Sequence, residues 1–183
     1  RGQGAGTHLM RHALAHLDAQ GVESIRLDAT ELGRPLYEKL GFIAQFKLAR
    51  WAGVANPPTS TPSSPSLKPQ DAMPAHRNAI VALDRDMMGV DRSALLSRLA
   101  SETGVHVRII PSPSGVSAFL MDRPGLKATF RGPCAGDPDA THALLVDALA
   151  RHAGKNLYID IPDLHARAHE LLRRAGLSPQ RPF

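Results

Sequence analysis

A run rich in proline, serine and threonine divides this chain into two parts of unequal length. Residues 56–70 read NPPTSTPSSPSLKPQ, a composition that cannot bury apolar area and is typical of a linker. We therefore expect a linker over residues 53–72 between a first part, residues 1–52, and a second part, residues 73–183. A chain of 183 residues has room for one ordinary domain, or for one domain and a piece of another.

The composition is that of a globular protein and argues against several other classes. Hydrophobic residues make up 43% and charged residues 21% of the sequence, and no apolar run approaches the roughly 20 residues of a membrane helix. The net charge of +5 is scattered and aromatic residues make up only 4%, which argues against nucleic-acid binding. The single cysteine, Cys134, excludes an intramolecular disulfide. Together with the lack of a signal-peptide pattern, it indicates a cytoplasmic protein.

The first part has the pattern helix, strand, helix, strand. Apolar spacing predicts a first helix that ends near Gly21, and alternation predicts strands over 23–29 and 42–51, with a short helix over 35–41 between them. Two strands cannot close a core by themselves. We therefore expect the rest of this sheet upstream of Arg1, which would make the first part a truncated domain.

The second part contains more elements. Helical spacing, strand alternation and turn residues indicate helix, helix, three strands, helix, strand and helix. The expected ranges are, in this order, 76–87, 92–101, 105–111, 116–122, 126–132, 138–153, 156–161 and 165–176. The order predicts an α/β architecture with a mixed central sheet flanked by helices.

An internal repeat relates the two parts. The segment LGRPLYEKLGF near the end of the first part aligns with ARAHELLRRAGL near the end of the second. In this alignment Tyr37 matches Leu172 and Gly41 matches Gly176, at one common separation of 135 residues. Each segment follows an expected strand and closes a helix on glycine, which indicates two copies of one fold, the first of them partial.

The chain begins with a glycine-rich loop, RGQGAG, in front of the first expected helix. Its backbone N–H groups and the positive end of the helix dipole can form a cradle for a diphosphate, and Arg1 can add a contact to a phosphate oxygen. The third glycine of a dinucleotide fingerprint and the lysine of a Walker loop are both missing. By itself the loop is also compatible with an ordinary turn before a helix, or with a site for another diphosphate.

The loop and the segment LYEKLGF together resemble the GCN5-related N-acetyltransferase (GNAT) family. The resemblance implies that residues 1–52 are the C-terminal half of an acetyl-CoA-binding domain, whose loop holds the coenzyme A pyrophosphate through backbone amides. It implies acetyl-CoA as the cosubstrate and no metal. The implied cofactor-binding residues are Arg1, Gly2, Gln3, Gly4, Ala5, Gly6 and Thr7.

The same resemblance implies a catalytic role for Tyr37. In this family an amine attacks the acetyl thioester directly, and a tyrosine at this position commonly protonates the departing thiolate. A phenol has a pKa of about 10, close to that of a thiol, so this proton transfer is nearly balanced. The alternative is that Tyr37 only packs its ring between helix and sheet. Thr30 stands where the family often has asparagine, which weakens the expected contact to the pantetheine arm of the cofactor.

The second copy departs from this pattern. Where the glycine loop is expected, the sequence reads FRGPCAGDPDAT. Pro133 lacks an amide donor, Asp137 and Asp139 would repel phosphate, and Leu172 cannot donate a proton. Residues 73–183 therefore resemble the degenerate C-terminal GNAT-like domain of some tandem acetyltransferases, and we expect them not to bind coenzyme A in the usual way.

Other polar residues are interpreted as structural. Two groups of histidines recur at helical spacing: His8, His12 and His16, and His165 with His169. No carboxylate or thiolate near them in sequence completes a metal site, so we predict none. Cys134 has no evident histidine partner in the sequence and is interpreted as a bystander thiol. Residues 84–86, with sequence DRD, are interpreted as a solvated helix end.

We therefore expect an N-acyltransferase that moves an acetyl group from acetyl-CoA to an amine of a small molecule or peptide. We expect no nucleic-acid partner and no membrane partner. The alternative is a non-catalytic ligand-binding or interaction module of the same fold. The general base and the oxyanion donors would lie upstream of Arg1, so we expect this chain to be a poor enzyme by itself.

Overall fold

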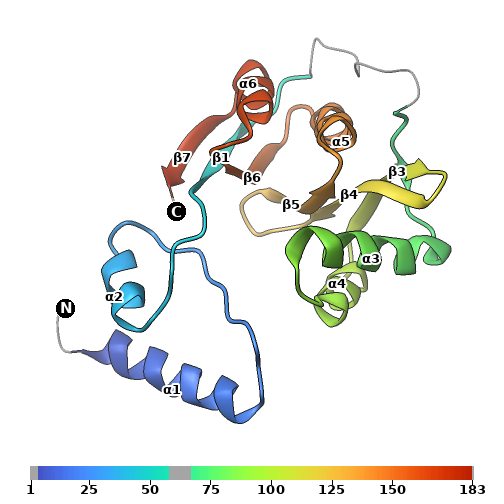
Figure 1. Cartoon of the computed structure of the whole chain (residues 1–183). Helices are drawn as coiled ribbons and strands as arrows, with labels where there is room; N and C mark the ends of the chain where they lie inside the picture. The colour runs from blue at the N-terminus through green and yellow to red at the C-terminus, as the bar shows by residue number, and fades with distance from the viewer. Residues whose placement is uncertain (1–3, 58–66, 183) are drawn as a thin grey trace. The chain divides into compact units, whose positions relative to one another are not determined.

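The computed structural model describes residues 4–57 and 67–182 (Figure 1). Contacts divide the chain into two compact units. The first unit is Arg1–Lys47 with Pro182–Phe183, and the second unit is Leu48–Arg181.

The first unit contains two helices, α1 (Ala5–Ala19) and α2 (Arg34–Lys39), which confirms both helices predicted for it. The apolar stripe of α1 is at most half-buried, and Leu9 is 70% exposed. None of the described residues 4–47 is fully buried. The described part of the first unit therefore has no closed core.

The strand predicted over 23–29 is wrong. Residues 22–30 form neither helix nor strand, although Ile25 and Leu27 are half-buried. An extended segment becomes a stable strand only beside a hydrogen-bonding neighbour. The seven strands that the structure describes all lie in one sheet, and none of them pairs with this segment.

The second unit is built on a seven-stranded sheet with the strand order β2-β3-β4-β5-β6-β1-β7. The strands are β1 (Leu48–Val54), β2 (Gln70–Asp71), β3 (His106–Ser112), β4 (Gly115–Arg123), β5 (Thr129–Gly136), β6 (Asn156–Pro162) and β7 (Ser178–Pro182). From β2 to β5 the neighbours run antiparallel, β5 and β6 run parallel, and β6 and β1 run antiparallel. The predicted mixed sheet is confirmed.

Helices cover both faces of this sheet (Figure 1). They are α3 (Arg77–Met88) and α4 (Ser93–Ala100) on one face, with the short 3₁₀ turn Pro74–His76 before α3, and α5 (Pro138–Arg151) and α6 (Ala166–Arg174) on the other. Under α3 and α4, Ile80 and Leu96 pack on Phe119. Under α5 and α6, Leu144 and Leu172 lie in the larger apolar cluster. The helices predicted for the second part are thus confirmed, and they enclose its core.

The strand β1 is central to the second unit. A strand is predicted over 42–51, but it begins only at Leu48 and pairs along its whole length with β6. Trp51 is 3% exposed in the core beneath α5 and α6, and Arg50 donates two hydrogen bonds, of 2.8 and 2.7 Å, to the carboxylate of Asp160. By its contacts β1 therefore belongs to the second unit, which begins before the predicted linker at 53–72.

Among the described residues, no helix combines the length and the apolar character that crossing a bilayer requires.

Candidate functional site

The first half of the candidate site is the start of α1. Gly4 precedes the helix with φ of 74°, a left-handed conformation that favours glycine, and its carbonyl accepts a hydrogen bond of 3.0 Å from the N–H of His8. The first turn carries no acidic residue, and no described side chain caps its N–H groups. The helix dipole and N–H groups that no described side chain caps make this end of α1 suited to an anion.

The structure describes four of the seven predicted loop residues. Gly4, Ala5 and Gly6 are exposed and Thr7 is half-buried. The other three, Arg1, Gly2 and Gln3, lie outside the described residues.

The second half of the candidate site is Tyr37 on α2. The carbonyl of Thr30 sets the start of this helix by accepting hydrogen bonds of 2.9 Å from the N–H groups of Gly33 and Arg34. Tyr37 is half-buried, and its ring packs edge-on against Phe42 with 5.9 Å between the ring centroids. No hydrogen bond of the Tyr37 hydroxyl is found within the described residues. The ring thus packs within the first unit while its hydroxyl keeps a donor for another group.

The start of α1 and α2 adjoin one another in the first unit. A Cβ added to Gly6 would lie 3.8 Å from Cδ2 of Leu36, the residue before Tyr37. The structure therefore brings together the two segments, loop and tyrosine helix, that the sequence analysis combines into one site.

The predicted repeat has a local structural counterpart. Both α2 and α6 end in a motif in which the residue after a left-handed glycine donates back to the helix. In α2 the N–H of Phe42 donates to the carbonyl of Tyr37 at 3.1 Å, and in α6 the N–H of Leu177 donates to Leu172 at 3.0 Å. The intervening glycines, Gly41 and Gly176, have φ of 90° and 84°. The aligned segments therefore end their helices through the same hydrogen bonds.

At the matching place in the second unit, the start of α5 is closed by a side chain. The carboxylate of Asp137 accepts hydrogen bonds from the N–H groups of Asp139 and Ala140, at 2.9 and 3.0 Å. Asp139 in turn is bound by Arg167 of α6. This helix end therefore has fewer free N–H groups than α1, and it carries two carboxylates that oppose a bound anion.

The position that matches Tyr37 is also chemically inert in the second unit. Leu172 is 0% exposed and packs in the core beneath α5 and α6. A buried leucine has no proton to give.

The histidines and the cysteine make structural contacts or none. His169 places Nε2 at 3.0 Å from the carbonyl oxygen of Pro162 and packs its ring 5.2 Å from that of Trp51, centroid to centroid. Burial raises the pKa of the Cys134 thiol to about 12, which removes its thiolate at neutral pH. Over residues 4–57 and 67–182 no three His, Cys, Asp or Glu side chains cluster as a metal site would require.

A buried charge cluster in the second unit was not foreseen from the sequence. Asp122 of β4 is 1% exposed, and its carboxylate lies 2.6 Å from Nη1 of Arg131, 2.7 Å from Nη2 of Arg151 and 3.4 Å from Nε2 of His152. The available signal was a charged residue at an inward-facing position in each of β4 and β5. The cluster joins the end of α5 to the sheet.

The interpretation of residues 84–86 as a solvated helix end is wrong for Asp84. This side chain is 1% exposed and accepts two hydrogen bonds from Arg92, at 2.9 and 2.5 Å. The Asp84 carboxylate can be buried because Arg92, at the start of α4, reaches back to α3 and neutralises it.

Comparisons with known proteins agree with this geometry. Two family models, each described as an acetyltransferase (GNAT) domain, match residues 80–182 and residues 1–55. The chain therefore belongs to the GNAT acetyltransferase family. No curated protein sequence matches the chain.

Solved structures of this family share the fold. A protein from Pyrococcus horikoshii described as an acetyltransferase has a TM-score of 0.72 at 22% identity, over 98% of this chain and 58% of that one. GCN5-related N-acetyltransferases from Sphaerobacter thermophilus and Anabaena variabilis have TM-scores of 0.64 and 0.61, at 16% and 13% identity, and each match covers 100% of this chain. This chain spans 67% and 50% of their respective lengths.

Proposed function

We propose that the protein transfers an acetyl group from acetyl-CoA to an amine, and that the first unit supplies the cofactor site. The observation that carries this proposal is the contrast between two helix ends. The start of α1 follows a left-handed Gly4 and has no capping side chain within the described residues, whereas the start of α5 is capped by Asp137. Family membership supports the reaction class.

The residues of the first unit suit a coenzyme A diphosphate. The loop Arg1–Thr7 would bind its oxygens through backbone N–H groups, helped by the dipole of α1 and by the Arg1 guanidinium. The small Gly4 and Gly6 leave the backbone open to close approach, since nothing described lies within 3.7 Å of a Cβ at either position.

In the proposed reaction an amine nitrogen attacks the thioester carbonyl carbon and the C–S bond breaks. The Tyr37 hydroxyl gives its proton to the departing thiolate, and the amine loses a proton to a base that we do not assign. A general acid of this kind contributes about 10²- to 10⁴-fold to a rate.

We further propose that the second unit is a non-catalytic copy. Its supporting observations are the Asp137 cap, the ion pair of Asp139 with Arg167 and the buried Leu172. The acceptor of the proposed reaction is the amine of a small molecule or a peptide.

The cofactor site is tested by titrating coenzyme A into the chain by isothermal calorimetry. Gly4→Asp adds a carboxylate at the start of α1, and we expect its negative charge to weaken coenzyme A binding at least tenfold. Asp137→Asn is the matched control, because it removes the carboxylate at the start of α5 in the second unit. It should leave the coenzyme A affinity of the chain unchanged. Equal binding by the wild type and Gly4→Asp, or loss of binding in Asp137→Asn alone, would contradict the proposal.

The role of Tyr37 is tested by an acetyl-transfer assay. Tyr37→Phe keeps the ring packing on Phe42 and removes the proton donor. We expect unchanged coenzyme A affinity and a kcat lower by about 10²- to 10⁴-fold. An unchanged kcat would assign Tyr37 to packing alone.

A further inference from the structure

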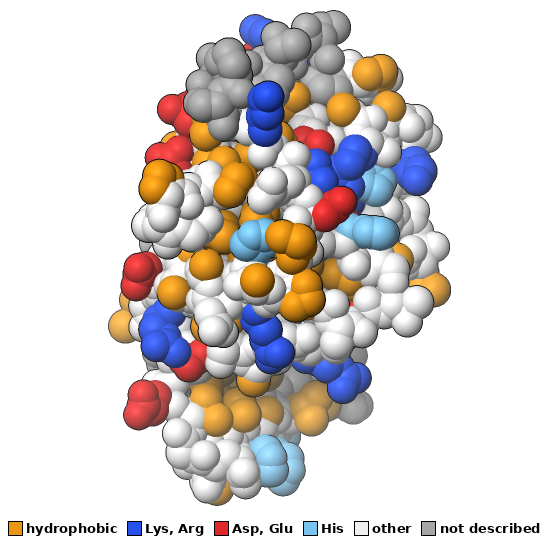
Figure 2. All heavy atoms as spheres, turned by 90° about the vertical axis from the view of Figure 1, so that its right-hand side faces the viewer, with side chains coloured by type: hydrophobic (Ala, Val, Ile, Leu, Met, Phe, Trp, Pro, Cys, Tyr) orange, Lys and Arg blue, Asp and Glu red, His pale blue; other side chains and the backbone are white. Residues whose placement is uncertain are grey.

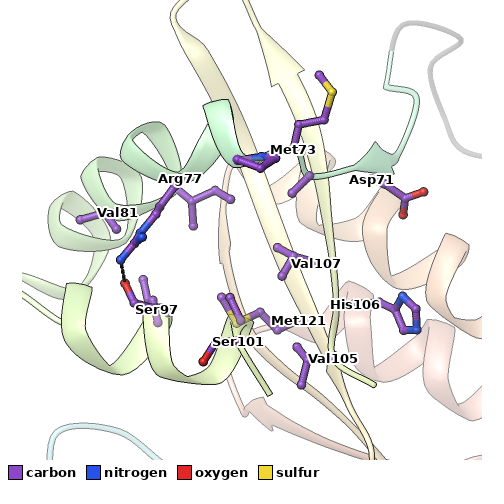
Figure 3. A pocket seen from close by; sticks show the side chains of 15 residues that line it. Asp71, Met73, Arg77, Val81, Ser97, Ser101, Val105, His106, Val107 and Met121 are labelled. Atoms are coloured by element: carbon purple, nitrogen blue, oxygen red, sulfur yellow. Dashed lines mark hydrogen bonds between the residues drawn. The ribbon is translucent and has the colours of Figure 1, made fainter. Parts of the chain in front are cut away.

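A cavity of about 460 Å³ lies in the second unit between α3, α4 and the strand β3 (Figure 3). This volume falls within the range of about 300–1,000 Å³ that is usual for small-molecule sites. The cavity is separate from the proposed cofactor site, because all of its lining residues belong to the second unit.

The inner walls of the cavity are apolar. Val81 and Leu96 contribute from α3 and α4, and Val107 and Met121 from β3 and β4. Figure 3 shows Val81 on the helical side of this space and Val107 and Met121 on the side of the strands. Such walls suit an apolar body.

One cation, Arg77, stands at the helical side of this cavity. Its Nη2 donates a hydrogen bond of 2.6 Å to Oγ of Ser97, so that it reaches from α3 to α4 (Figure 3). No carboxylate within the described residues forms an ion pair with it. It is also the first residue of α3, where the helix dipole disfavours a positive charge. Arg77 is exposed to solvent and has no carboxylate partner among the described residues, so its charge is available to an anion bound beside it.

The other charged residues near the cavity do not neutralise Arg77. Asp71 lines the cavity but is paired with Arg108 at 2.9 Å. In Figure 3, Asp71 and His106 lie on the far side of the strands from Arg77. Figure 2 turns toward the viewer the side of the molecule where β3 and the start of α3 lie, and it shows hydrophobic side chains exposed among basic and histidine side chains.

We propose that this cavity binds a small apolar carboxylic acid, with the apolar body between Val81 and Val107 and the carboxylate on the guanidinium of Arg77. A carboxylate supplies the counter-charge that no described residue gives to Arg77. A charged hydrogen bond in a half-enclosed site is strong enough to orient the ligand. The second unit then acts as a binding module in addition to any part it has in acetyl transfer.

The experiment titrates 2-naphthoate into the chain by isothermal calorimetry, with the uncharged 2-naphthamide as the matched ligand. We expect 2-naphthoate to bind at least tenfold more tightly than 2-naphthamide. Arg77→Met removes the charge but keeps an apolar stem, and it should weaken 2-naphthoate about 10- to 100-fold. Ala100→Leu, which adds volume to the cavity wall, should weaken both ligands.

Two controls separate binding from folding and from the proposed acetyl-CoA site. Arg98→Met removes a cation from α4 outside the cavity, and Gly4→Asp alters only the first unit. Both should bind 2-naphthoate within about threefold of the wild type, with unchanged melting temperatures for the second unit. No binding at millimolar concentration, equal affinity for the two ligands, or an unaffected Arg77→Met would overturn the proposal.

Discussion

Asp122, like Asp84, is a buried carboxylate of the second unit. It contacts three basic side chains, and Arg131 beside it has a fully buried side chain. Burial lowers the pKa of Arg131 and Asp122 opposes that shift. Removing one partner from such a pair leaves a charge in an apolar interior with nothing to compensate it.

We predict that Asp122→Ala destabilises the second unit by about 3–5 kcal/mol, because Arg131 stays buried without its counter-charge. Urea unfolding followed by circular dichroism measures the change. The double variant Asp122→Ala, Arg131→Met should recover a large part of the loss. If the double variant is as unstable as the sum of the two single variants, the two charges are not coupled.

Two histidines of the second unit predict the direction of its pH dependence. Burial, with a smaller effect of nearby arginines, lowers the pKa of both His142 and His152. The folded state therefore favours the neutral rings, and the unfolded chain takes up protons first as the pH falls below about 6.5. Stability should be at its plateau above that pH and should fall on acidification.

The measurement is the free energy of unfolding at pH 7.5 and at pH 5.5, which lies above the range where carboxylates titrate. We expect the wild type to lose more stability over this interval than the double variant His142→Gln, His152→Gln. A loss of the same size in both proteins would assign the pH dependence to other groups.

At the scale of elements, the strand β1 decides how the second unit is completed. It pairs with β6 over seven residues and places Trp51 in the main core. Strand β6 therefore lies between two strands from different parts of this unit. Its neighbour β1 comes from the start of the unit, and its neighbour β5 comes from the middle. Such a non-local partner cannot be deduced from alternation within β1 itself.

We predict that Trp51→Ala destabilises the second unit by about 3–5 kcal/mol, because it leaves a cavity between β1 and the helices α5 and α6. Chemical denaturation of the whole chain gives the value. Phe46→Ala, at an exposed apolar position before β1, is the matched control and should cost less than about 1 kcal/mol. A small effect of Trp51→Ala would mean that β1 contributes little to the core.

At the scale of the whole molecule, the two units differ in how much they bury. The second unit has two apolar clusters on the two faces of its sheet. None of the residues described for the first unit is fully buried. Local opening costs least where few apolar contacts must be broken.

We therefore predict that amides of α1 exchange with solvent much faster than those of α5, although both are regular helices of similar length. Hydrogen–deuterium exchange followed by mass spectrometry compares the two in one sample, with α5 as the internal reference. Equal protection of α1 and α5 would show that the first unit is held by contacts beyond those described.

Much of the fold could be predicted because its signals are local. Apolar spacing predicted all six α-helices among the described residues, and the Gly41 and Gly176 positions predicted two helix ends that share one hydrogen-bond motif. The glycine loop and Tyr37 remain predictions for a catalytic site, now on adjoining segments of one unit.

The residues that could not be predicted depend on partners far away in the sequence. Alternation gave residues 23–29 the pattern of a strand, yet a strand requires a neighbour that the described residues do not provide. The sequence indicated a solvated Asp84, because nothing near it in the sequence shows that Arg92 folds back onto it. The cavity beside Arg77 exists only because α3, α4 and β3 meet.

The sequence by itself determined the family and the local helix geometry, since motif spacing and left-handed glycines act within a few residues. Only the tertiary structure decided which unit β1 completes, which charges are buried around Asp122, and that Asp137 caps the start of α5 while no described side chain caps that of α1. Those outcomes follow from hydrogen-bond pairing and desolvation between distant segments, and a linear pattern does not contain them.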